Sequence, residues 1–195
     1  MSKIIRASLL GASALALALS FSAITTPTFA EMAEKTVMVG GAEMFPSKNI
    51  IENAVNSKDH TTLVAAVKAA GLVETLSGKG PFTVFAPTNE AFAKLPKDTV
   101  PTLLKPENKD TLTGILTYHV VAGKLSAADL AAKAKEMGGK VELKTVAGGT
   151  LTIMGDDKGG WLVVDAKGGK SKITIADVNQ SNGVIHVIDG VALPN

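Results

Sequence analysis

The chain has 195 residues, of which 46% are hydrophobic, with no cysteine and a formal net charge of +2. This apolar content excludes a disordered chain, and the absence of cysteine excludes both a disulfide framework and a lipid anchor on cysteine. The length suits one domain with one ordinary core.

The first thirty residues have the three-part pattern of a secretory signal. Lys3 and Arg6 give a positive start, residues 7–24 are uncharged, and small residues end the segment at Ala30. We therefore expect residues 1–30 to be a signal peptide that is removed, so that the protein is exported to the periplasm or the extracellular space. The alternative is an uncleaved membrane anchor, because the uncharged run reaches the length of about 18 residues that can span a bilayer. After cleavage we expect no stable membrane insertion.

Removal of this segment changes the charge balance. The segment holds two of the 20 basic residues and none of the 18 acidic residues, so the exported chain has equal numbers of each. Arg6 is the only arginine, and every basic residue of the exported chain is therefore lysine. Since arginine supplies the planar fork that binds phosphate and guanine, we expect no nucleic-acid partner.

The first half of the exported chain is predicted to be mostly helical. Residues 31–47 are broken by two glycines and a proline and are expected to form an extended arm, followed by a single domain over residues 48–195. Asp59 is the expected N-cap of the second helix, and Gly71 its end. Apolar spacing predicts, in chain order, helices over 48–56 and 61–70, a strand over 82–86, a short helix that begins after Thr88, and helical segments over 98–117.

The second half is predicted to be mostly strand. Ser126 and Asp129 have the spacing of a capping box for an alanine-rich helix that ends at Gly138. The separation of helices from strands predicts an α+β fold with a largely antiparallel sheet. Glycine-rich turns separate most of the expected strands, which cover 118–122, 141–146, 150–154, 161–165, 172–178 and 184–188.

The sequence shows no assembled catalytic or metal-binding set. It lacks a Gly-x-Ser-x-Gly elbow, a His-Glu-x-x-His helix and a P-loop. His60 begins a helix and is expected to be solvated, whereas His186 lies in an apolar strand and is expected to be a hydrogen-bonded structural group. Residues 156–160 are typical of a charged hairpin turn, because they lack the ligand pattern of a calcium loop. We therefore expect no enzyme, no metal and no cofactor.

Three segments resemble the signatures of the fasciclin domain family, in order and spacing. Residues 80–92 read GPFTVFAPTNEAF, residues 118–121 read YHVV, and residues 182–189 read NGVIHVID. The resemblance extends from about Ile50 to Pro194. It implies a wedge-like antiparallel β-sandwich with helices packed mainly from the N-terminal half, and a role in cell adhesion or matrix contact.

The signature residues are expected to be structural before they are functional. Asn182 and Gly183 would supply the positive φ angles of a tight turn. Alternate residues of the first signature would lie on opposite faces of a strand, with Phe82, Val84 and Ala86 on one face and Thr83 and Phe85 on the other. The positions assigned a structural role are Pro81, Phe82, Thr83, Phe85, Pro87, Thr88, Phe92, Asn182, Gly183, His186 and Asp189.

Four residues are candidate binding residues by the resemblance. In animal relatives, the Tyr-His motif and an Asp-Ile pair before the closing signature have been linked to integrin contact. The matching positions are Tyr118, His119, Asp177 and Val178. The leading hypothesis is a monomeric, non-catalytic adhesion or recognition module that binds a cell-surface or matrix protein or polysaccharide. The alternative, motivated by the apolar composition, is a periplasmic carrier of a small apolar ligand or lipid.

Overall fold

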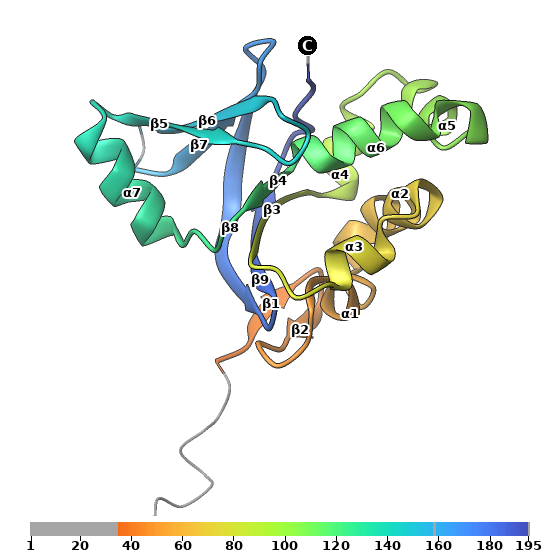
Figure 1. Cartoon of the computed structure of the whole chain (residues 1–195), viewed down its shortest axis with the longest axis horizontal. Helices are drawn as coiled ribbons and strands as arrows, with labels where there is room; N and C mark the ends of the chain where they lie inside the picture. Colours follow the sequence, from red (N-terminus) through yellow and green to blue (C-terminus); the bar gives the residue numbers. More distant parts are fainter. Residues whose placement is uncertain (1–34, 158, 195) are drawn as a thin grey trace, which may run out of the picture. The chain divides into compact units, whose positions relative to one another are not determined.

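The computed structural model describes residues 35–157 and 159–194 (Figure 1). The expected signal peptide over 1–30 and the first residues of the expected arm lie outside this range. No helix in the described part of the chain is long and apolar enough to cross a bilayer.

The helices come mostly from the N-terminal half, as predicted, and lie on one side of strands β3 and β9 in Figure 1, apart from α7. Side-chain caps at Asn49, Thr88 and Ser126 begin three of them, because each accepts backbone N–H groups of the first turn. The helices are α1 Ile50–Ala54, α2 Thr61–Ala70, α3 Val73–Ser77, α4 Asn89–Ala93, α5 Thr99–Leu103, α6 Lys109–Tyr118 and α7 Ala127–Glu136, with 3-10 turns η2 Lys58–His60 and η3 Pro106–Asn108.

Seven strands form one mixed sheet in the order β4-β3-β9-β8-β7-β6-β5. All neighbouring pairs are antiparallel except β3 and β9, which are parallel. The expected antiparallel sheet therefore contains one parallel pair, formed by its second and third strands. The strands are β3 Phe82–Pro87, β4 Val120–Ala122, β5 Lys140–Lys144, β6 Thr150–Gly155, β7 Trp161–Val164, β8 Lys170–Gln180 and β9 Gly183–Ile188.

Strand β8 lies in the middle of the strand order, and its bend folds one half of the sheet over the other half. Its register with β9 shifts twice between Ile173 and Val178, and such bulges increase the bend of a strand. Thr145, which directly follows the edge strand β5, forms a β-bridge to Val121 of β4 at the opposite edge, so the two ends of the sheet meet. The implied sandwich is therefore one sheet folded on itself.

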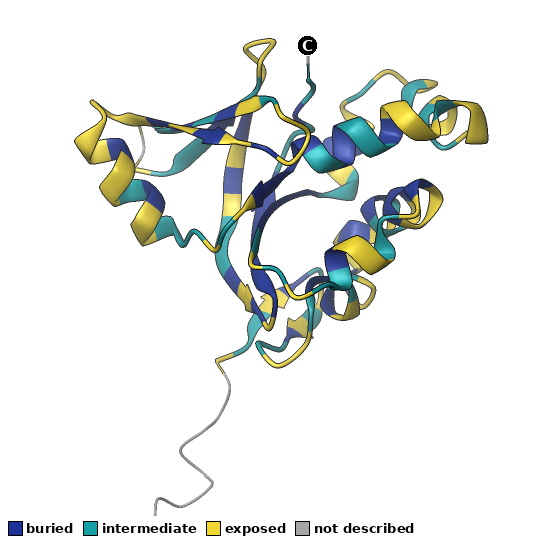
Figure 2. Cartoon of the chain, in the orientation of Figure 1, coloured by how far each residue is buried: buried dark blue, intermediate teal, exposed yellow. Residues whose placement is uncertain are grey.

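Two apolar clusters lie on opposite faces of β3, as the alternation of its residues predicts. Val84 and Ala86 pack with helices α1, α2, α3 and α6 in the first cluster. Phe85 packs inside the folded sheet in the second cluster, which α7 closes with Leu130 and Ala134. Figure 2 shows the central strands as the most buried part of the domain.

The segment expected as an extended arm is a hairpin over most of its described length. Strand β1 Val37–Val39 pairs antiparallel with β2 Ala42–Met44. Val39 and Met44 are buried in the first cluster, since the hairpin places them on one face. The two glycines between the strands, expected to break the chain, instead adopt positive φ and form the turn.

Two further expectations are corrected. The strand predicted over 118–122 begins only at Val120, because Tyr118 is the last residue of α6 and His119 is its C-cap. Asp59 does not cap α2: the N-cap position is His60, and the side chain of Asn89 accepts the hydrogen bond from the Thr62 backbone N–H.

Candidate functional site

Tyr118, a candidate binding residue, lies in the interior with no exposed surface. Its hydroxyl group donates to the Thr150 carbonyl oxygen at 2.6 Å and accepts from the Ala166 N–H at 3.0 Å. Burial raises the pKa of this phenol. The ring lies so close to Gly149 that a Cβ there would be 2.6 Å from Tyr118 Cε2. Tyr118 therefore joins α6 to two hairpin turns of the sheet.

His119 is also buried, and both of its ring nitrogens are engaged. Nδ1 donates to the Ile115 carbonyl oxygen at 2.8 Å, and Nε2 accepts from the Ala192 N–H at 3.0 Å. With one donor and one acceptor, the imidazole is neutral. Burial lowers its pKa, against the smaller opposing effects of the Ile115 carbonyl and the Asp165 charge. His119 fixes the C-terminal segment against α6.

Asp177 lies at the second register shift of β8 with a φ angle of 58°. Its Oδ1 accepts from the Ala127 N–H at 2.7 Å, at the first residue of α7. Its own N–H donates to His186 Nδ1 at 3.3 Å. The next residue, Val178, is only 1% exposed and belongs to the first apolar cluster. The polar groups of Asp177 therefore hold the sheet and α7 together.

His186 is fully buried and stacks on Phe85, with ring centroids 5.6 Å apart. Its Nε2 donates to the Leu125 carbonyl oxygen at 2.9 Å, and its Nδ1 accepts from Asp177. Burial lowers its pKa, so the ring is neutral. Together these contacts connect β9, the bulge of β8 and the segment before α7.

Asn182 and Gly183 differ from expectation in their geometry. Neither has a positive φ angle. Gly183 is required because a Cβ there would collide with the Phe82 carbonyl oxygen of the adjacent strand. The Asn182 amide donates to the carbonyls of Leu76 and Gly78 at 2.8 Å each and accepts from the Ile50 N–H at 3.1 Å.

The remaining signature residues are also occupied by internal contacts. Thr83 Oγ1 donates to the Gly123 carbonyl and accepts from the Leu125 N–H. The Asp189 carboxylate accepts from the Lys172 N–H at 2.7 Å and lies 3.5 Å from Lys94 Nζ. Phe85, Pro87 and Phe92 are buried, Phe82 and Thr88 are half-buried, and Pro81 is exposed.

His60 contradicts the expectation of a solvated side chain, since it is only 3% exposed. Its Nδ1 lies 2.9 Å from Ser57 Oγ. Its Nε2 has no hydrogen bond of good geometry among the described residues. Burial lowers the pKa of His60, against the smaller effects of a hydrogen bond with the Ala86 backbone and of the Asp59 charge. No local pattern indicates this burial, because the turn η2 is positioned by residues far along the chain, such as Asn89, which donates to the Lys58 carbonyl oxygen.

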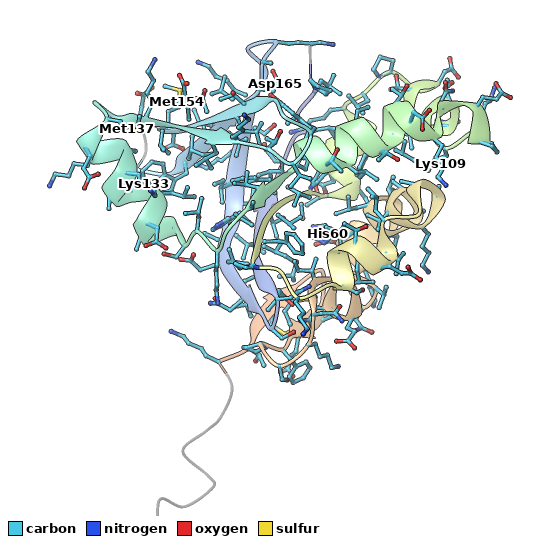
Figure 3. All side chains as sticks on the ribbon, in the orientation of Figure 1. His60, Lys109, Lys133, Met137, Met154 and Asp165 are labelled. Atoms are coloured by element: carbon cyan, nitrogen blue, oxygen red, sulfur yellow. The ribbon has the colours of Figure 1, made fainter. Side chains whose placement is uncertain are left out.

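His60 lies on the wall of a cavity of about 50 Å³ between the sheet and helices α1, α2 and α3. Figure 3 shows the side chain between the central strands and α2. His119 and Val178, two of the four candidate binding residues, line the same cavity, whereas Tyr118 and Asp177 do not. Apart from Ser57, His60, Lys68 and His119, every lining residue is apolar.

A second feature is the outer face of strands β5 to β8, on the side of the sheet away from α7. Strand register places Met154 beside Leu162 and Thr152 beside Val164, all half-buried, in the middle of this face. Figure 3 shows Met154 pointing away from α7. Four exposed lysines and one glutamate surround these residues, and we call the whole set the lysine-bordered face: Lys140, Glu142, Lys144, Thr150, Thr152, Met154, Leu162, Val164, Lys170 and Lys172.

Within residues 35–157 and 159–194, no three His, Asp or Glu side chains group as metal ligands do. Asp156 lies in the turn between β6 and β7, where it accepts from the Gly160 N–H and forms an ion pair with Lys172 at 3.2 Å. Met44 is packed in the core, while Met38 is exposed.

Comparison with known proteins identifies relatives over most of the chain. The Fasciclin domain family model matches residues 58–194. Protein sll1483 of Synechocystis sp. is 48% identical over 181 residues, which cover 91% of this chain and 93% of that protein. Cell surface glycolipoprotein MPB83 of Mycobacterium bovis is 36% identical over 148 residues, 72% of this chain and 58% of that protein.

The fold also matches a solved structure, that of a FAS1 domain pair from the insect cell adhesion molecule Fasciclin I. The TM-score is 0.67 with 21% sequence identity. The match covers 75% of this chain and 51% of the other, so this chain corresponds to about half of the domain pair. At this identity the likeness concerns the fold.

Proposed function

The chain belongs to the fasciclin domain family, and from this premise we propose that it is an exported recognition module that binds an acidic component of a cell surface or matrix. The family is non-catalytic. The name of a cell surface glycolipoprotein among its relatives supports a role at surfaces.

The lysine-bordered face is the observation that carries this proposal. Its half-buried centre offers apolar contact area, and its four lysines exceed the two carboxylates beside them, Glu142 of the face and Asp156, which pairs with Lys172. The exported chain as a whole has no net charge, so the positive charge of this face is a local feature of the surface. A positive face attracts acidic partners and orients them on approach. Of the four residues inferred by resemblance, Tyr118, His119 and Val178 are buried and the half-buried Asp177 is hydrogen-bonded to α7, which directs the proposal to this outer surface.

A charge-reversal experiment tests the proposal. The triple variant Lys140→Glu, Lys144→Glu and Lys170→Glu changes exposed residues of the face. Its matched control makes the same charge change at the exposed Lys97, Lys105 and Lys109, which lie outside the face. We expect the first variant to lose binding to surfaces of the producing organism, and the control to retain it.

Two further measurements define the partner. Binding should weaken as salt is raised, because exposed charges are screened over about 8 Å at physiological ionic strength. Protease treatment of the target surface should abolish binding to a protein, and glycosidase treatment binding to a polysaccharide. Equal loss in both triple variants, or no binding by the unmodified domain to any surface, would refute the proposal.

The cavity beside His60 favours the second function, a carrier of a small apolar ligand. Its walls are almost entirely apolar, as is typical of ligand pockets. Its volume of about 50 Å³ is well below that of the apolar cavity of roughly 150 Å³ that accommodates benzene. A small molecule fits these dimensions better than a lipid. Native mass spectrometry of protein purified from its host tests for such a ligand.

A further inference from the structure

The lysine-bordered face carries its lysines along two sides, with apolar residues between them. Strand register places Lys140, Met154, Leu162 and Lys172 in one row across β5, β6, β7 and β8. Since neighbouring strands lie about 4.8 Å apart, the two ends of this row are about 14 Å apart. The face is therefore an apolar strip along β6 and β7, with one lysine border on β5 and another on β8.

Three of the four lysines are available to a partner. Lys172 pairs with Asp156, whereas the exposed Lys140, Lys144 and Lys170 form no ion pair with any residue that the structure describes. Lys140 and Lys144 are four residues apart, which corresponds to about 14 Å along a strand. Both borders thus present at least one ammonium group that can attract an acidic group of another molecule.

The apolar strip disfavours several kinds of partner. A polysaccharide would place hydroxyl groups against Met154, Leu162 and Val164, where they find few hydrogen-bond partners. A second copy of this chain would bring the same lysines and be repelled. An extended peptide occupies the width of one strand, about 4.8 Å, and cannot reach both borders at once.

An α-helix has the matching width and pattern. With its side chains a helix is about 10–12 Å wide, so a helix that lies along β6 and β7 covers the strip and reaches both borders. The length of the β5 border, about 14 Å, corresponds to two to three helical turns. An amphipathic helix presents one apolar stripe, and acidic residues on both sides of that stripe would face the two lysine borders.

From this arrangement we propose that the lysine-bordered face binds an amphipathic helix of a partner protein. The apolar stripe of the helix packs on Met154, Leu162 and Val164, and its acidic flanks face the lysines of β5 and β8. This inference rests on the proposed function and specifies its partner as a protein. Protease treatment, and not glycosidase treatment, should therefore remove the sites to which the domain binds.

The test uses a synthetic peptide of about 18 residues, or five turns of helix, with a leucine stripe bordered on both sides by glutamate and with alanine elsewhere. Protein labelled with nitrogen-15 is titrated with the peptide and followed by NMR. We expect the backbone amides of β5 to β8 to shift, and circular dichroism to show that the peptide gains helix on binding. The peptide should also displace the domain from surfaces of the producing organism.

A matched peptide separates the effect of helical shape from that of charge. It carries proline in place of a central alanine, which keeps every glutamate and leucine but breaks the helix. We expect this peptide to bind at least about tenfold more weakly, since proline inside a helix is strongly unfavourable.

Single substitutions test whether the helix contacts both borders and the strip. Lys144→Glu on β5 and Lys170→Glu on β8 should each weaken the helical peptide about two- to fivefold, the range that one exposed ion pair supplies. Lys97→Glu, outside the face, is the matched control and should leave its affinity unchanged. Leu162→Thr keeps a residue suited to a strand, removes apolar contact and should also weaken binding. Melting curves establish that each variant is folded.

Three results would overturn the inference: equal affinity of the proline peptide, an effect of lysine reversal on one border only, or amide shifts away from β5 to β8. Vesicles of phosphatidylglycerol and phosphatidylcholine in equal parts provide a second probe. If they bind through the same lysines and the helical peptide does not, the face contacts an anionic membrane and the inference is wrong.

The failure of this inference can be distinguished from that of the proposed function. If the triple lysine variant loses surface binding but the helical peptide cannot displace the unmodified domain, only the helical partner is refuted. If the triple variant still binds surfaces as the unmodified domain does, the proposed function is refuted, and the helical partner with it.

Discussion

The backbone N–H of Asp177 donates a hydrogen bond to Nδ1 of His186, with 3.3 Å between the two nitrogens. The carboxylate of the same aspartate accepts from the Ala127 N–H at the start of α7. Asp177, which the family resemblance suggests for partner contact, thus makes two hydrogen bonds within the domain. This contact explains why a non-glycine residue is held at a φ angle of 58°.

The first prediction concerns Asp177 itself. Asp177→Ala removes the acceptor for the Ala127 N–H and leaves a residue that tolerates positive φ poorly, so we expect a loss of about 2 kcal/mol in the free energy of unfolding. Asp177→Asn keeps an acceptor oxygen and the tolerance of positive φ, and should cost less than about 0.5 kcal/mol. Urea denaturation measures both. Equal stability of the two variants, with binding lost only in Asp177→Ala, would assign the residue to partner contact instead.

A second prediction follows from the burial of His186. His186→Ala leaves the Asp177 N–H and the Leu125 carbonyl without partners and opens a space beside Phe85, so we expect a loss of about 2–4 kcal/mol. The melting temperature should fall, while binding by the fraction that remains folded should persist. An unchanged melting curve together with abolished binding would show that the histidine acts in recognition.

Local patterns predicted much of this fold because they depend on neighbouring residues. The cap at Ser126, the two faces of β3 and the strands of the second half follow from spacing within a few residues. Tyr118 and His119 were misplaced on a strand, since their apolar neighbours fit either element. Their true position depends on partners at Thr150 and Ala192, far along the chain.

The cavity and the burial of His60 could not be predicted for the same reason. The residues that enclose His60 come from the hairpin, four helices and the central strands, and no local pattern links them. The lysine-bordered face, by contrast, was within reach. Lys140, Glu142 and Lys144 alternate with buried residues along β5, and the same alternation recurs in β6. The register that places these strands side by side could not be predicted from the alternation within each strand.

The third prediction concerns the stability of the folded protein at acidic pH. Burial lowers the pKa of His60, His119 and His186 below the ordinary value of 6.5, and outweighs the nearby carboxylates Asp59, Asp165 and Asp177. Below pH 6.5 the unfolded chain therefore binds more protons than the folded one, and stability falls as the pH falls. Above pH 6.5 this contribution is constant.

Below pH 6.5, each buried histidine can lower the free energy of unfolding by up to about 1.4 kcal/mol for each unit by which the pH falls. Between pH 7.5 and 5.5 we expect the free energy of unfolding to drop by up to about 4 kcal/mol, measured by urea denaturation. His60→Leu should show about two thirds of that drop, because two of the three groups remain. A stability that stays level down to pH 5 would contradict the neutral, buried state of these rings.

The last prediction tests the close packing of the parallel pair β3 and β9. A Cβ at Gly183 would collide with the Phe82 carbonyl oxygen, and this atom cannot move without displacing β3 from β9. We expect Gly183→Ala to cost at least about 2 kcal/mol in the free energy of unfolding, measured by thermal and urea denaturation.

Gly114 provides the matched control. It lies within α6, where a Cβ would meet no atom within 4 Å, so Gly114→Ala should stabilise the protein by about 0.5–1 kcal/mol through helix propensity alone. The change from glycine to alanine is thus expected to lower the free energy of unfolding at position 183 and to raise it at position 114. If Gly183→Ala stabilised the protein as much as Gly114→Ala, the close approach of β9 to β3 would not be what requires glycine at position 183.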